Sequence, residues 1–151
     1  MPKILLPSDF AQRAKAGETL DQICGGSGAR TAKLVGVSAQ ALPGADDRSV
    51  DFTISTGAVD RYNSTIAVEG WDCAAYERNP VVLWAHDDSI PAIGRATQTR
   101  VEGGSLKSRA TFCDRDTHPL ADTVYRLIKG GYIGAASVGW IPTKWAFIED
   151  K

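Results

Sequence analysis

Residues 93–112 read IGRATQTRVEGGSLKSRATF, and this stretch decides the fold class. Two segments of strand length, Ile93–Val101 and Ser105–Phe112, flank the turn sequence Glu102-Gly103-Gly104. Strand-forming runs joined by a short glycine-containing turn are typical of a β-hairpin. The stretch therefore predicts two neighbouring antiparallel strands at the centre of the domain.

Further strands are predicted on both sides of this hairpin. Val50–Ser55 alternates apolar and polar residues, and Val81–Ala85 is a continuous apolar run of strand length. A last strand is expected over Ile133–Trp140, continuing over 143–148 after Pro142. Regular helices do not separate these strands, as a doubly wound parallel sheet would require. A β-barrel-like domain is therefore the expected fold.

Two helices are predicted within this β-rich region. The first covers Trp71–Arg78 and stops before Pro80. The second is capped by Thr117 or His118, has Pro119 in its first turn and ends at Lys129-Gly130-Gly131. An apolar stripe along one side predicts the face of this second helix that packs on the sheet.

Residues 1–48 differ in pattern from residues 49–151. A short helix capped by Ser8-Asp9 is expected to run toward Ile23, with an interruption at Gly17, and to break at the glycines of 25–28. We expect residues 1–48 to form an N-terminal arm or pre-segment, followed by a single domain.

Composition excludes several classes of protein. The net charge of −1 and the dispersed charges argue against a nucleic-acid-binding or membrane-surface protein. No run reaches the length of a membrane span or of a signal-peptide core, so we expect a soluble protein without a standard export signal. The cysteines (Cys24, Cys73 and Cys113) are three in number and scattered, which argues against a disulfide framework or a zinc site.

Two histidines limit the search for a general base. His86 ends the most apolar segment, just before a polar turn, where a barrel strand would bring its side chain to the rim. Ser137 lies among small residues in Gly134–Trp140, which would let a substrate backbone approach closely and leave N–H groups for an oxyanion. A serine needs an adjacent base to act as a nucleophile. Taken singly, each residue fits a structural role better than a catalytic one.

Two other clusters of polar residues could form functional sites. Cys113 to His118 brings a thiol, carboxylates and an imidazole together, and it could be a metal site or a Cys–His pair. A charged loop that caps a helix is the favoured interpretation. His86-Asp87-Asp88 could also bind a metal ion, but no further ligand is evident, so no metal or cofactor is expected.

The order of these segments resembles the prohead maturation proteases of tailed phages, which are distantly similar to the herpesvirus assemblins. The segments that carry the resemblance, within 49–148, are Asp60-Arg61, Gly70-Trp71, NPVVLWAH at 79–86, Ile93-Gly94, the hairpin, the helix ending at 129–131, and SVGW at 137–140. It implies a serine endopeptidase with His86 as general base and Ser137 as nucleophile. It also implies a closed or nearly closed antiparallel barrel with two or three helices packed outside.

The resemblance further implies the substrates and the place of action. Family members cleave scaffold and the scaffold-like part of the capsid protein, and often themselves, inside the prohead that assembles in the bacterial cytoplasm. Their third catalytic residue follows the serine on a later strand, whereas this sequence stops at Glu149-Asp150-Lys151. We therefore expect the domain to lack its C-terminal part.

An edge strand without its neighbour would pair with another chain, so a homo-oligomer is expected. The alternative function is a catalytically incomplete capsid- or scaffold-associated interaction domain, and a Cys113–His118 thiol enzyme ranks third.

Overall fold

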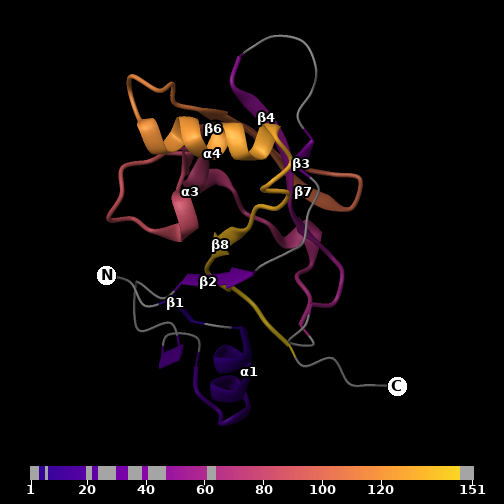
Figure 1. Cartoon of the computed structure of the whole chain (residues 1–151). Helices are drawn as coiled ribbons and strands as arrows, with labels where there is room; N and C mark the ends of the chain where they lie inside the picture. The colour runs from indigo at the N-terminus through magenta and orange to yellow at the C-terminus, as the bar shows by residue number, and fades with distance from the viewer. Residues whose placement is uncertain are drawn as a thin grey trace. The chain divides into compact units, whose positions relative to one another are not determined.

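The computed structural model describes residues 4–5, 7–19, 22–23, 30–33, 39–40, 47–60 and 64–146 (Figure 1). The chain divides into two compact units, one of Met1–Lys33 with Val138–Lys151 and the other of Leu34–Ser137. His86 and Ser137 both belong to the second unit. The expected arm of residues 1–48 stays a prediction.

The second unit is built on one antiparallel sheet with the strand order β3-β4-β7-β6-β5. Its strands are β3 (Ala39–Gln40), β4 (Ser49–Thr56), β5 (Val81–Val82), β6 (Gly94–Glu102) and β7 (Ser105–Phe112). Bulges interrupt the register between Thr53 and Ser55 in β4 and between Ala96 and Gln98 in β6. Bulges bend the strand that contains them, and β4, β7, β6 and β5 curl into a half-barrel. The mainly β expectation is confirmed, whereas the described residues do not show a closed barrel.

β6 and β7 are the predicted hairpin. Their register runs from Gly94 opposite Phe112 to Glu102 opposite Ser105. Gly103 and Gly104 have φ angles of 58° and 69°, as a two-residue turn with the twist of its strands requires. The prediction of this hairpin is confirmed.

The core lies between this sheet and α4 (Pro119–Lys129), which Figure 1 shows lying across the strands. Phe112 is at its centre, with ring centroids 6.4 Å from Phe52 and 5.9 Å from Tyr125. The buried residues of the core are Val50, Phe52, Ile93, Ala110, Phe112, Ala121, Val124, Tyr125 and Ile128. The predicted helix and its packing face are confirmed. His118 is the N-cap residue, which is one of the two predicted positions, although its side chain makes no capping hydrogen bond.

Other predicted elements are shorter in the structure. The expected strand at 81–85 ends at Val82, because a 3-10 turn, η2 (Trp84–His86), reverses the chain. The helix expected over 71–78 is confined to α3 (Ala74–Glu77), which follows a second 3-10 turn, η1 (Val68–Gly70). The last strand, β8 (Val138–Trp140), covers only the end of the predicted 133–140 span. Residues 143–146 are not a strand, and 147–148 lie outside the described residues.

The first unit contains a small sheet in the order β1-β2-β8. β1 (Ile4–Leu5) pairs in parallel with β2 (Arg30–Lys33), and β2 is antiparallel to β8. The helix α1 (Pro7–Lys15) ends two residues before Gly17, whose φ of 84° suits glycine at a helix C-terminus, so the predicted interruption at Gly17 is confirmed. Among the helices of the described residues, none combines the length and the apolar character needed to cross a bilayer.

Candidate active site

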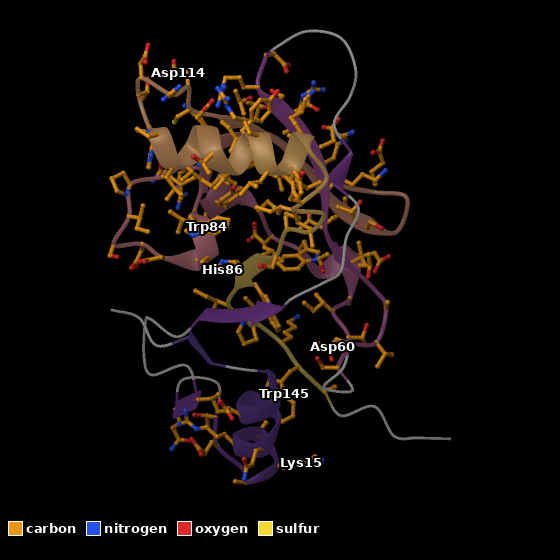
Figure 2. The ribbon with its side chains drawn as sticks, in the orientation of Figure 1. Lys15, Asp60, Trp84, His86, Asp114 and Trp145 are labelled. Carbon is orange, nitrogen blue, oxygen red and sulfur yellow. The ribbon has the colours of Figure 1, made fainter. Side chains whose placement is uncertain are left out.

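The structure brings His86 and Ser137 into direct contact. Nε2 of His86 lies 2.6 Å from Oγ of Ser137, across a sequence separation of 51 residues. Both residues are half-buried, so the pair is shielded but reachable from solvent. Figure 2 shows His86 close to Trp84 on the segment that follows β5. A nucleophilic serine and its general base need a contact of this kind.

His86 is held by an unusual backbone turn. Ala85 has φ 52° and ψ 28°, and His86 has φ 57°, so two successive non-glycine residues adopt the left-handed conformation. Such residues cost about 1 kcal/mol or more each and tend to cluster at functional sites. The turn is closed by the Asp87 N–H, which donates to the Trp84 carbonyl at 2.9 Å. The chain reversal directs the His86 imidazole toward Ser137 instead of continuing the strand.

Ser137 is positioned by the segment that leaves α4. The N–H groups of Tyr132 and Ile133 both donate to the Leu127 carbonyl, at 2.9 and 3.3 Å, which anchors the segment to the last turn of the helix. Ile133 and Ala136 then pack against the hydrophobic core. Because Ala136 is the residue next to Ser137, the packing of the core fixes where the hydroxyl lies.

The environment of His86 favours its neutral form. Burial lowers the pKa of this imidazole below its ordinary value near 6.5. A neutral imidazole can accept the proton of the Ser137 hydroxyl at Nε2, and its own proton is then on Nδ1. The pair therefore has the protonation state that a nucleophile and its general base need at neutral pH.

No orienting acid accompanies the pair within the part of the chain that the structure describes. The neighbouring Asp87 is engaged in its own turn: its carboxylate accepts the Ser89 hydroxyl at 2.6 Å and the Ser89 N–H at 2.9 Å. These two bonds hold the pKa of Asp87 below its usual value. Glu149 and Asp150 lie outside the described residues. Among the described residues, the site is a serine–histidine pair without a carboxylate on the second imidazole nitrogen.

The Cys113 to His118 cluster forms a structural loop. The Asp114 carboxylate accepts the Thr117 N–H at 2.7 Å, and Cys113 packs against the core. Nε2 of His118 donates to the Pro91 carbonyl at 3.1 Å, which ties the start of α4 to the loop that follows His86. Within the described ranges, no group of three or more His, Cys, Asp or Glu residues could hold a metal ion. The charged-loop interpretation fits this geometry.

Two contributors to the site have no signature in the sequence. Ala85 carries the left-handed turn although alanine gives no indication of a positive φ. The His118–Pro91 contact joins residues 27 apart, and only the packing of α4 brings them together.

Comparison with known proteins gives no relative. No family model, no curated protein and no solved structure matches this chain. Any assignment of function therefore depends on the residues of the site and on their geometry.

Proposed function

We propose that this chain is a serine endopeptidase of the prohead maturation type, with Ser137 as nucleophile and His86 as general base. The observation that supports it best is the 2.6 Å contact between Oγ of Ser137 and Nε2 of His86. Two distant segments that each resemble a protease motif meet at the one pair of atoms that must exchange a proton. The closed barrel of the assemblin-like fold belongs to the same proposal.

The chemistry follows from the protonation state of the pair. Oγ of Ser137 attacks the carbonyl carbon of the scissile peptide bond while its proton passes to Nε2 of His86. The imidazolium then gives that proton to the departing amine, which leaves an acyl ester on Ser137. Water hydrolyses the ester, with His86 again acting as base. The small residues of Gly134–Gly139 leave room for the substrate backbone at this point.

The proposed substrates and setting depend on the resemblance. They are the scaffold and major capsid proteins of a tailed phage, cut inside the prohead in the bacterial cytoplasm, together with the chain itself. We propose a homo-oligomer, and neither nucleic acid, membrane nor cofactor takes part.

A second candidate function is a catalytically incomplete interaction domain of the same fold. It is favoured by the lack of a carboxylate on Nδ1 of His86 among the described residues, since an orienting acid contributes strongly to catalysis in serine proteases. Under this alternative the chain would bind capsid or scaffold protein without cutting it.

The decisive experiment is labelling with a fluorophosphonate probe, which reacts covalently with activated serines. We expect tryptic mass spectrometry of the full chain to find the label on Ser137, and Ser137→Ala and His86→Ala to abolish it. Ser89→Ala is the matched control, because Ser89 is an exposed serine bonded to the neighbouring carboxylate of Asp87. Label that persists in Ser137→Ala would refute the assignment of the nucleophile.

Peptide cleavage distinguishes the two candidate functions. A proteome-derived peptide library incubated with the chain should yield new termini, and Ser137→Ala should lower their rate of formation by about a thousandfold or more. Co-expression with scaffold and capsid protein should show processing that stops in the same variant. A folded chain, verified by circular dichroism, that neither takes the label nor cuts any peptide would support the interaction domain instead.

A further inference from the structure

Over most of its length, the outer edge of β6 has no strand of the described residues beside it. β5 covers only Gly94 and Arg95, and the Ala96 N–H still donates to the Pro80 carbonyl at 2.8 Å. From Thr97 to Glu102, no strand of the described residues pairs on that side. Six residues of β-strand extend about 20 Å, long enough to pair with a short extended peptide.

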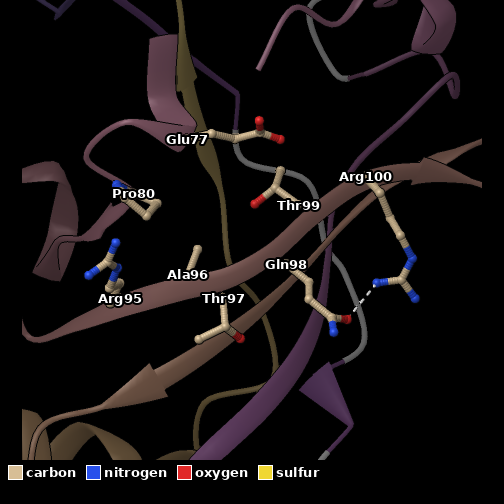
Figure 3. A pocket seen from close by; sticks show the side chains of 8 residues that line it. All are labelled: Glu77, Pro80, Arg95, Ala96, Thr97, Gln98, Thr99 and Arg100. Carbon is tan, nitrogen blue, oxygen red and sulfur yellow. Dashed lines mark hydrogen bonds between the residues drawn. The ribbon is translucent and has the colours of Figure 1, made fainter. Parts of the chain in front are cut away.

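A groove runs along this free edge. Its volume is about 720 Å³, and Figure 3 shows β6 crossing its floor with Glu77 and Pro80 on one side. The lining residues are Glu77, Pro80 and the β6 residues Arg95 to Arg100. Neither His86 nor Ser137 is among the residues that line the groove.

The hairpin geometry sets which backbone groups face the groove. In a hairpin with a two-residue turn, the pair that flanks the turn is hydrogen-bonded, and hydrogen-bonded pairs then alternate along the strands. Glu102 and Ser105 flank the turn here, so the next hydrogen-bonded pair is Arg100–Lys107, and the backbone groups of Arg100 point toward β7. Thr99 and Val101 consequently direct their N–H and C=O groups to the free edge, where an added strand would find them.

Charge indicates the chemistry of the occupant. Arg95 is exposed and forms no ion pair within the described residues, and the Arg100 guanidinium reaches Gln98 and Glu102 along the same strand. Two guanidiniums and the single carboxylate of Glu77 line the groove. A second copy of β6 carries two arginines and one glutamate, so it would bring no net negative charge to these guanidiniums. An acidic peptide would give Arg95 an ion-pair partner and would share Arg100 with Glu102, whose carboxylate lies 3.1 Å from that guanidinium.

We propose that this groove binds an extended, acidic peptide segment as an added strand along β6. Backbone pairing at Thr99 and Val101 would provide affinity, and Arg95 and Arg100 would select glutamate or aspartate side chains on the peptide. In a protease this groove would anchor a substrate away from the cleavage point. That exosite role rests on the proposed function, whereas the binding itself does not.

The test uses the full chain with Ser137→Ala, so that peptide cleavage cannot interfere. The probe is a fluorescein-labelled peptide of about ten residues that alternates valine and glutamate, the pattern of an extended strand, and binding is followed by fluorescence anisotropy. Its control has lysine in place of glutamate. We expect saturable binding of the glutamate peptide, and binding weaker by about tenfold or more for the lysine peptide.

Variants and modified peptides locate the site. Arg95→Gln with Arg100→Gln should weaken binding by about tenfold, whereas Arg115→Gln with Arg126→Gln, which changes net charge equally outside the groove, should leave it unchanged. A strand pairs through one edge only. N-methylation of either all valines or all glutamates should therefore abolish binding, and N-methylation of the other set should not.

Three outcomes would overturn the proposal. These are unchanged affinity in the Arg95/Arg100 variant, equal binding of the two N-methylated peptides, and no binding of the glutamate peptide. A dimer that persists in the presence of the glutamate peptide and prevents its binding, seen by analytical ultracentrifugation, would assign this edge to a second copy of the chain instead. All of these readouts are independent of fluorophosphonate labelling, so failure here leaves the serine–histidine proposal untouched.

Discussion

Arg48 joins the start of β4 to α4, and its removal gives a sharp test of how burial sets the strength of an ion pair. Its Nη1 lies 2.9 Å from Oδ1 of Asp122, and its guanidinium lies 4.5 Å from the centre of the Tyr125 ring. Nη2 also donates to the Cys113 carbonyl at 2.8 Å. The Arg48 and Asp122 side chains are only 22% and 8% exposed. Loss of Arg48 would leave the buried Asp122 carboxylate with one of its two ion-pair partners.

The same carboxylate provides the control. Nε of Arg126 lies 2.8 Å from Oδ2 of Asp122, but the Arg126 side chain is 69% exposed. Breaking a buried ion pair costs about 3–5 kcal/mol. Because Asp122 keeps its contact with Arg126, we expect Arg48→Met to lower the unfolding free energy by about 3 kcal/mol, at the low end of that range. Arg126→Met should cost about 0.5 kcal/mol, as exposed pairs do. Methionine keeps the unbranched stem and the same backbone cost at the positive φ of Arg48.

Equilibrium unfolding in urea, followed by circular dichroism, measures both changes. The slope of the unfolding free energy with urea should stay the same, so that the midpoints report stability alone. Equal losses in the two variants, or a loss below about 1 kcal/mol for Arg48→Met, would refute the reasoning that burial decides the strength of these contacts.

Three further predictions concern the backbone and the histidine. Gly94→Ala should lower the unfolding free energy by about 2 kcal/mol or more, because the added Cβ would lie 2.4 Å from the Thr111 carbonyl oxygen. Gly134→Ala is the control: an added Cβ there meets open space, so the unfolding free energy in the same urea assay should change by about 0.5 kcal/mol at most. Ala85→Gly should be nearly neutral, within about 0.5 kcal/mol, since relief of the left-handed strain offsets the entropy that glycine adds to the unfolded chain; a loss of about 1 kcal/mol or more would argue against that strain. Burial lowers the pKa of His86, so between that pKa and about 6.5 the unfolded chain binds more protons than the native one. The unfolding free energy should therefore rise with pH through this window and level off above it, and His86→Gln should remove that part of the rise; an identical pH dependence in this variant would contradict the assignment.

Local patterns were sufficient where the physical cause is local. The β6–β7 hairpin follows from two strand-forming runs around glycines that accept positive φ angles, and α4 follows from Pro119, its apolar stripe and the terminal glycines. The strand expected to end at His86 was wrong in its length, because an apolar run predicts burial but not where the chain reverses. The 3-10 turn there depends on Ala85 adopting a conformation that its side chain does not favour.

By itself, the sequence determined the β-rich class, the central hairpin and the helix that covers the sheet, and it proposed His86 and Ser137 through a resemblance to known proteases. The tertiary structure alone decided that His86 and Ser137 touch, because their contact depends on η2 and on the core packing of Ile133 and Ala136. It also decided that the sheet is a half-barrel with an open β6 edge, and that no carboxylate of the described residues accompanies the imidazole. Periodicity records which side chains are buried, whereas contacts between distant segments depend on how the whole sheet bends around its core.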